Sequence, residues 1–452
     1  MMHITERAAR HKSTVVSTCV ALSLLPLYYG SWRFHLASKP AQLEPIHHTP
    51  IWSHQFIDDW LETQIIEPFD PAALRRYCDL MTWRPNLVLN LADANGGIGN
   101  IRGNFLDFFM YAIEAGASIM LPGRATRNED DLHDVWAGRA AFDTFFDEQW
   151  FLYTMQEACP KLSIYNFEVH HLDTIDGIYT PRSRRVYAEA ELDKKAYLKD
   201  LDQWLSTRSE YTQDNKTVVN YSRTLWEYDT RGMPPGVRRT MGQLLRINPT
   251  IRRLAAAVVQ QLAERFEIHI NPRDAMPQDA FFGAHLRTES DALAAGWLNA
   301  PNTNFSAQTD AYIEQAVAHK LNVMFVASGN ASDLQRFKEK AAAYNPPLSV
   351  TSKLDLLSSA QLDELQALTW DQQALVDYEV LQRCSVFGGF VRSSFSYNIA
   401  LTRNQWLDDH GLLVDPWTVL HSEEAVAFDD GYSRVIGRDE LHESKIPRGM
   451  WP

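Results

Sequence analysis

The 452-residue sequence has few cysteines and no surplus of positive charge. Four cysteines do not make a disulfide framework. Cys78, Cys159 and Cys384 could form one bridge at most, and we expect each to be a buried free thiol. A formal net charge of −14 argues against general nucleic-acid binding. An anionic ligand therefore needs a local site built from arginines and helix ends.

Internal repeats and long low-complexity tracts are absent as well. The hydrophobic content of 45% over 452 residues is ample for two domains of ordinary size plus appendages. Short apolar runs of strand length alternate with stretches of helical periodicity along most of the chain. This alternation predicts an α/β architecture.

The N-terminus carries a topology signal. Residues 14–32 contain no charged side chain and follow Arg7, Arg10 and Lys12. About 20 residues are needed to cross a bilayer, and positive charge before the span favours a cytoplasmic N-terminus. We therefore expect a type II signal anchor in the Golgi or endoplasmic reticulum, with the body of the protein lumenal. A cleaved signal peptide and a buried N-terminal helix are the alternatives.

We divide the chain into five parts. Residues 1–33 form the cytoplasmic tail and anchor, and 34–85 a stem with a helical lead-in around residues 57–77. Two α/β domains follow, over 86–245 and 246–420, and residues 421–452 form a C-terminal tail. Four glycosylation sequons fit a lumenal body. They begin at Asn215, Asn220, Asn304 and Asn330.

A glycine-rich turn in the first domain is the most informative local feature. Residues 87–91 are an apolar run of strand length, residues 95–100 read Asn-Gly-Gly-Ile-Gly-Asn, and 101–115 have one apolar helical face. Such a turn brings backbone N–H groups close to a phosphate at the start of a helix. The turn predicts a nucleotide or nucleotide-sugar site, with a purely structural tight turn as the alternative.

Two further elements supply phosphate ligands in the second domain. His285 and Arg287 stand at the end of a predicted strand over 281–286, where open α/β sheets bind ligands. The Arg287 guanidinium suits phosphate oxygens, although pairing with Glu289 or Asp291 is the alternative.

The second of these elements is a helix start. Ser393 and Ser394 open a predicted helix and offer hydroxyls and free N–H groups. A simple helix cap is the alternative for the two serines. Phe395 is either a core residue or a surface for a base.

Three motifs together resemble the GDP-fucose protein O-fucosyltransferase superfamily, in particular its fungal-type members. They are residues 95–102, 285–289 and 392–398, and the resemblance covers roughly residues 86–405. It implies a GT-B fold, in which two Rossmann-like domains face a cleft. It also implies metal-independent transfer from a GDP-sugar, with inversion at the sugar carbon and no cofactor. No Asp-x-Asp pair looks like a metal-binding loop.

The resemblance also implies roles for individual residues. Arg287 and His285 would stabilise the leaving diphosphate, and Asp377 stands where some members have an acid, either a guanine contact or a surface residue. No residue is a secure base, because a glycine replaces the turn glutamate of some members. Glu289 and Asp93 are the nearest candidates by sequence. The remaining substrate-binding candidates are Gly96, Gly97, Gly99, Asn100, Arg102, Ser393, Ser394 and Phe395.

The sequence thus predicts a glycosyltransferase that moves fucose, or a related sugar, to a hydroxyl of a protein or glycan. Two alternatives remain. One is a non-catalytic member that binds GDP-sugars. The other is an NADP-dependent oxidoreductase, in which Arg124 would hold the 2′-phosphate after the second strand.

Overall fold

A computed structural model describes residues 51–452 except 182–193, 213, 300–301, 413–425 and 438–448. Residues from Thr49 to Pro452 form one compact unit. None of the helices in the described part is both long and apolar enough to cross a bilayer. The predicted anchor, residues 14–32, lies outside the described residues.

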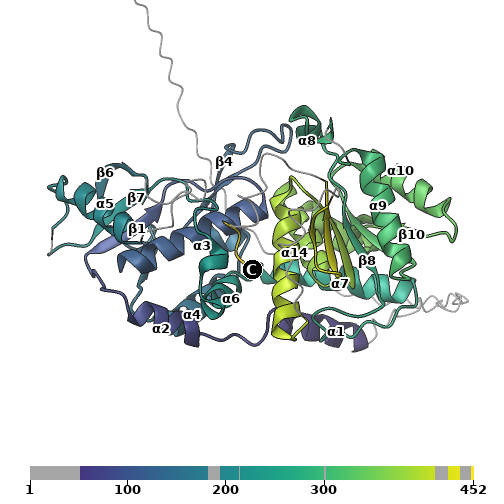
Figure 1. Cartoon of the computed structure of the whole chain (residues 1–452), viewed down its shortest axis with the longest axis horizontal. Helices are drawn as coiled ribbons and strands as arrows, with labels where there is room; N and C mark the ends of the chain where they lie inside the picture. Colours follow the sequence, from purple (N-terminus) through teal and green to yellow (C-terminus); the bar gives the residue numbers. More distant parts are fainter. Residues whose placement is uncertain (1–50, 182–193, 213, 300–301, 413–425, 438–448) are drawn as a thin grey trace, which may run out of the picture. The chain divides into compact units, whose positions relative to one another are not determined.

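The first sheet has five parallel strands in the order β5-β2-β1-β7-β6 (Figure 1). Its central strand β1 is buried along most of its length, which explains the apolar run in the sequence. The strands are β1 (Leu87–Leu91), β2 (Ser118–Met120), β5 (Ile164–Tyr165), β6 (Asp173–Tyr179) and β7 (Thr217–Tyr221). A short antiparallel hairpin, β3 (Arg124–Thr126) and β4 (Gly138–Ala140), stands apart from both larger sheets.

The second sheet has six strands in the order β10-β9-β8-β11-β13-β12, all parallel except β12. The predicted C-terminal tail, residues 421–452, is therefore wrong in part, because β12 and β13 complete this sheet. Trp451 is also buried, and its Nε1 donates to Asp107 Oδ1 at 2.8 Å. The strands are β8 (Phe282–His285), β9 (Val323–Ala327), β10 (Ser349–Thr351), β11 (Val386–Phe390), β12 (Val426–Asp429) and β13 (Ser433–Ile436).

Fourteen α-helices lie within the described residues. Helix α14 packs on α3 and also on β11 and β13, so it joins elements of both sequence halves (Figure 1). The helices are α1 (Ile51–Glu62), α2 (Ala72–Asp79), α3 (Ile98–Ala115), α4 (Glu148–Ala158), α5 (Lys194–Ser206), α6 (Pro235–Gln243), α7 (Pro249–Arg265), α8 (Ser290–Ala294), α9 (Phe305–Ala318), α10 (Ala331–Ala342), α11 (Lys353–Leu356), α12 (Ser359–Gln366), α13 (Trp370–Gln382) and α14 (Ser394–Asp409). Short 3₁₀ helices cover Phe142–Thr144, Thr230–Gly232 and Trp297–Asn299.

Helix α3 differs from its predicted form in two ways. It begins at Ile98 inside the glycine-rich turn, and it is buried nearly all round rather than on one face. Burial on all sides follows because α14 covers the surface that the first sheet leaves open. The helix ends at Gly116, whose φ of +64° leaves no room for a side chain, since a Cβ would lie 1.9 Å from the Thr82 carbonyl oxygen.

The helical lead-in is two helices instead of one. Helix α1 ends at Glu62 and α2 begins at Ala72, with Pro68 and Pro71 between them. Proline removes a backbone donor and clashes with the preceding helical turn, so a continuous helix over 57–77 was wrong.

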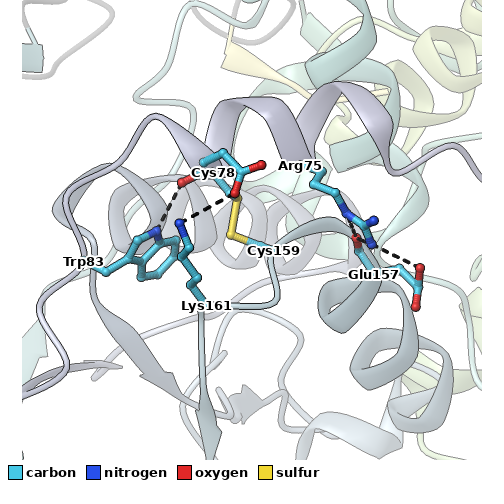
Figure 2. The surroundings of a disulfide bond; sticks show 7 residues. Arg75, Cys78, Trp83, Glu157, Cys159 and Lys161 are labelled. Atoms are coloured by element: carbon cyan, nitrogen blue, oxygen red, sulfur yellow. Dashed lines mark hydrogen bonds and ion pairs between the residues drawn. A yellow bond between two sulfur atoms is a disulfide. The ribbon is translucent and has the colours of Figure 1, made fainter.

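A disulfide joins Cys78 of α2 to Cys159, which directly follows α4 (Figure 2). The prediction of free thiols was wrong for this pair and right for Cys384, which is buried and unpaired. The two bonded cysteines are 81 residues apart, and nothing in their local sequence indicates that α2 and α4 lie side by side. Arg75 and Glu157 form an ion pair at 3.2 Å beside the bond.

Candidate active site

A cavity of about 750 Å³ opens at the carboxyl ends of β1, β8, β9 and β11. This edge of a parallel sheet is where α/β proteins bind ligands. Residues of both sequence halves line the cavity. The predicted residues among them are Gly96, Gly97, Gly99, Asn100, His285, Arg287, Glu289, Asp377, Ser393, Ser394 and Phe395.

The glycine-rich turn touches the start of α14. A Cβ on Gly99 would lie 2.5 Å from the backbone carbonyl carbon and oxygen of Ser394. Beside this contact, Ser394 Oγ donates to Asn100 Oδ1 at 2.8 Å. Glycine at position 99 therefore lets two segments almost 300 residues apart in sequence meet at the cavity wall.

Two helix N-termini consequently face the same cavity. Helix α3 begins after Gly97, which has no side chain to cap its first N–H groups. Helix α14 begins after Ser393, whose side chain accepts from Ser396 N. Backbone N–H groups at helix starts attract anions, and here two such starts lie within one cavity.

His285 is held as a neutral imidazole. Its Nδ1 lies 2.8 Å from Ser396 Oγ, which also accepts the Phe390 N–H at 2.9 Å. The Phe395 ring lies over it with a centroid separation of 4.6 Å. Burial lowers the pKa of His285 to about 4. At neutral pH the ring is uncharged and can donate one hydrogen bond to a ligand.

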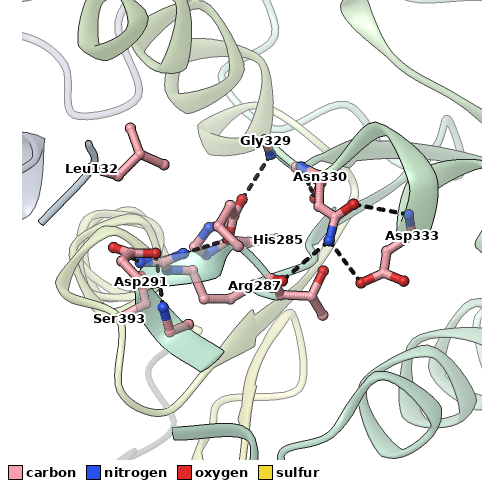
Figure 3. Close-up of polar contacts among 12 residues, drawn as sticks. Leu132, His285, Arg287, Asp291, Gly329, Asn330, Asp333 and Ser393 are labelled. Atoms are coloured by element: carbon pink, nitrogen blue, oxygen red, sulfur yellow. Dashed lines mark hydrogen bonds and ion pairs between the residues drawn. The ribbon is translucent and has the colours of Figure 1, made fainter. Parts of the chain in front are cut away.

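Arg287 is paired with two carboxylates of its own chain segment (Figure 3). Nη1 contacts Glu289 Oε2, and Nη2 lies 2.6 Å from Asp291 Oδ2. Glu289 Oε1 in turn accepts the Gly329 N–H at 2.7 Å. Burial disfavours the charged guanidinium, but the two acids outweigh burial and raise the pKa of Arg287. Arg287 thus lines the cavity with its charge balanced internally.

Asp377 is buried rather than on a helix surface. Its Oδ2 pairs with Lys353 Nζ at 2.6 Å, while Oδ1 accepts no hydrogen bond from the residues that the structure describes. Burial raises the pKa of Asp377, and Lys353 opposes the increase. Both residues line the cavity, so Asp377 presents an acceptor there.

Two predicted residues do not line this cavity. Arg102 points to another part of the interior, where its Nη2 donates to the Gly242 carbonyl at 2.5 Å. Asp93 is half-buried beside Arg223 and Arg139, and burial raises its pKa. Neither residue has the place that substrate binding or base catalysis in this cavity requires.

Several lining residues were missed because no local motif marks them. Arg127, Arg223, Trp297 and Trp370 all line the cavity. Arg127 Nε lies 3.3 Å from Asp371 Oδ1 of α13, across 244 residues of sequence. Arg392 was quoted as part of a motif without a role, and it lines the cavity too.

The oxidoreductase alternative loses the residue on which it depended. Arg124 is buried 3.7 Å from the Phe145 ring centroid and 3.8 Å from Asp371 Oδ2, and it does not line the cavity. Within the described residues, no group of three or more histidine, cysteine or acidic side chains is placed to hold a metal ion.

Two parallel sheets, a glycine-rich turn and a cavity with two helix N-termini define an α/β protein with an anion-binding site. The model of the GDP-fucose protein O-fucosyltransferase family matches residues 88–405, so the chain belongs to that family. The predicted resemblance is confirmed.

Solved structures with a similar fold include three fucosyltransferases. POFUT1 in complex with GDP has 12% identity and a TM-score of 0.42, covering 72% of this chain and 96% of that one. NodZ α-1,6-fucosyltransferase soaked with GDP-fucose has 14% identity and a TM-score of 0.37, covering 71% and 92%. A mutant of Arabidopsis thaliana FUT1 in complex with GDP has 11% and 0.36, covering 78% and 77%. No curated protein matches the chain in sequence.

Proposed function

We propose that this protein is a glycosyltransferase that moves fucose, or a related sugar, from a GDP-sugar to a hydroxyl group of a protein or glycan. The observation that carries the proposal is the meeting of Arg287, neutral His285 and the starts of α3 and α14 at one cavity, in a chain of this family. We place the two sheets in a GT-B arrangement, with the cavity as the donor and acceptor cleft.

In this proposal the guanosine diphosphate lies against Arg287 and the start of α14. The acceptor oxygen attacks the sugar carbon from the face opposite the diphosphate. As the bond to the diphosphate breaks, its electron pair leaves with the phosphate oxygen. Negative charge grows there, so contacts from Arg287 and the His285 ring N–H strengthen in the transition state. These groups supply the positive potential, and we therefore propose transfer without a metal.

Guanine recognition is assigned to Asp377. Its buried Oδ1 is an unused acceptor on the cavity wall. Guanine offers adjacent N–H donors on its ring and its exocyclic amine, which match a carboxylate. The adjacent Lys353 holds the carboxylate in its ionised form.

A calorimetric titration of the purified protein with GDP and GDP-fucose tests the donor site, first without added metal and then with EDTA. We expect binding that survives chelation and is lost in Arg287→Ala. The control is Arg336→Ala, which removes an exposed arginine on α10. No GDP binding by the wild-type protein would overturn the proposal, and loss of binding with EDTA would overturn its metal-free form.

A non-catalytic member is the second candidate, and the engagement of Glu289 favours it. Oε1 of this carboxylate accepts the Gly329 N–H and Oε2 contacts Arg287, so neither oxygen is idle for the acceptor proton. This candidate predicts GDP binding with no release of GDP from GDP-fucose against any acceptor. Turnover with any hydroxyl acceptor removes it.

We further propose a type II membrane protein of the Golgi or endoplasmic reticulum with its body in the lumen. The Cys78–Cys159 disulfide supports a lumenal body, since such bonds persist in oxidising compartments. Among the four sequons, Asn215 is exposed, whereas Asn304 and Asn330 cap helices with their side chains. We expect endoglycosidase to shift the mobility of the cellular protein and Asn215→Gln to abolish the shift. An unglycosylated cellular protein would contradict this location.

A further inference from the structure

A second, smaller cavity of about 50 Å³ lies where α3, α7, α13 and α14 come together. It is separate from the candidate active site, with no lining residue in common. Four arginines line it: Arg102, Arg246, Arg252 and Arg383. Among the lining residues, all of which the structure describes, Glu379 is the only carboxylate.

Two of these arginines have a carboxylate partner. Arg252 Nε lies 3.3 Å from Glu379 Oε2. Arg246 Nη2 lies 2.5 Å from Asp147 Oδ2. The single acid of the wall is therefore already paired, and the positive charge of Arg252 and Arg246 is balanced.

Arg102 has no such partner. It is 4% exposed, and its Nη2 donates to the Gly242 carbonyl at 2.5 Å. Its Nη1 is buried and makes no hydrogen bond to any residue that the structure describes. Burial lowers the pKa of Arg102, and no carboxylate opposes that effect. A buried guanidinium without a counter-charge is costly unless something else supplies the negative charge.

Arg383 adds a second unbalanced charge to the same wall. It is 3% exposed and stacks on the Trp60 ring at 3.5 Å. Nη1 and Nη2 donate to backbone carbonyls, including that of Trp60 at 3.2 Å, while Nε lacks a partner among the described residues. The described cavity wall therefore has two guanidinium groups without an ion pair and two unused N–H donors.

From this arrangement we propose that the cavity binds one small monovalent anion, chloride in the cell, between Arg102 and Arg383. The volume exceeds the roughly 15 Å³ that one water needs and is far below that of a nucleotide. The anion accepts the unused N–H donors and offsets the excess positive charge. Arg102, which stands in the glycine-rich motif yet misses the active site, thereby has a binding role of its own.

The anion also connects two elements of the active site. Arg102 stands two residues after Asn100 on α3, and Tyr378 of the cavity wall follows Asp377 on α13. A bound anion therefore stabilises the position of α3 relative to α13. This inference is independent of the proposed sugar transfer.

Crystals of the full chain grown with bromide in place of chloride give the direct test. We expect an anomalous peak within hydrogen-bond distance of Arg102 Nη1. A water at this position, or bromide at exposed surface sites only, overturns the proposal. This experiment uses the wild-type protein, so it decides the matter even where a variant fails to fold.

Thermal unfolding gives the second test. Chloride replaces gluconate at constant ionic strength, and we expect the Tm of the wild-type protein to rise and then saturate. Arg102→Met should lose this dependence, while the matched variant Arg287→Met should keep it. A chloride effect that persists in Arg102→Met, or disappears in Arg287→Met, places the ion elsewhere and overturns the proposal.

Discussion

Arg287 Nη2 lies 2.6 Å from Asp291 Oδ2, so the arginine assigned to the diphosphate already holds an anionic partner. Glu289 is its second partner, and it is also fixed by the Gly329 N–H. Asp291 is tied less firmly, since its other oxygen accepts only the adjacent Ala292 N–H. A diphosphate that binds Arg287 therefore competes with Asp291.

Asp291→Asn should strengthen GDP binding by about tenfold, because the change removes a charged competitor for one arm of the guanidinium. Isothermal titration calorimetry measures the effect. Asp310→Asn is the control, since it removes an exposed acid that pairs with Lys340 on neighbouring α10. Unchanged or weaker binding by Asp291→Asn would show that this carboxylate orients Arg287 for the ligand instead of competing with it.

Local sequence was sufficient for the motifs and insufficient for their partners. The glycine-rich turn, the strand end at His285 and the helix start at Ser393 each follow from short patterns. The contact of Asn100 with Ser394 joins residues 294 positions apart, and no spacing rule connects them.

The same reason explains the errors in the sequence analysis. The Cys78–Cys159 bond depends on α2 packing beside α4. Arg102 has a helical position that points away from the turn it follows, so a motif read as one unit assigned it to the wrong cavity. Pairing of Arg287 with Asp291 was foreseeable as an alternative, because the two are four residues apart.

His285 predicts a loss of stability in acid. Its pKa is 6.5 when unfolded and about 4 when folded, so below pH 6.5 the unfolded chain binds a proton that the folded protein does not. Stability is therefore lost as the pH falls from 6.5 towards 4, by about 3 kcal/mol from this residue. Urea unfolding of wild type and His285→Gln at several pH values checks this, with His319→Gln, on an exposed position, as control. Parallel pH curves for wild type and His285→Gln would contradict it.

Asp377 predicts a preference for the guanine base. Inosine diphosphate lacks the exocyclic amine of GDP, so it loses one donor to the carboxylate. We expect wild-type protein to bind GDP at least about tenfold more tightly than inosine diphosphate, as expected for one charged hydrogen bond. Asp377→Asn should reduce that ratio towards one in competition titrations. A ratio unaffected by Asp377→Asn would place the base elsewhere in the cavity.

The Cys78–Cys159 bond closes a span of 81 residues, which by the chain-entropy model stabilises the protein by roughly 4 kcal/mol. We expect the double variant Cys78→Ala/Cys159→Ala to unfold at a clearly lower urea concentration. Reducing agent should lower the wild-type midpoint in the same way and leave the variant unchanged. If reduction shifts both proteins equally, the stabilisation does not come from this bond.

Gly99 and Gly97 form a matched pair within one turn. A methyl group at position 99 would lie 2.5 Å from the Ser394 backbone, whereas one at position 97 meets nothing within 4 Å. The φ of Gly97 is −73°, which alanine adopts without strain. Gly99→Ala should therefore push the start of α3 away from α14 and lower the free energy of unfolding by about 1–3 kcal/mol. Gly97→Ala should change it by no more than about 0.5 kcal/mol.

Ligand binding separates this contact from a general loss of stability. If the contact between the turn and α14 shapes the donor site, Gly99→Ala should lose GDP affinity at temperatures where it remains folded, as monitored by circular dichroism. Ser394→Ala removes the hydroxyl that donates to Asn100 but keeps the close backbone approach, so it should weaken GDP binding less than Gly99→Ala. Equal losses in the two variants would assign the effect to the hydroxyl, and full GDP affinity in Gly99→Ala would show that the donor site tolerates separation of the two helix starts.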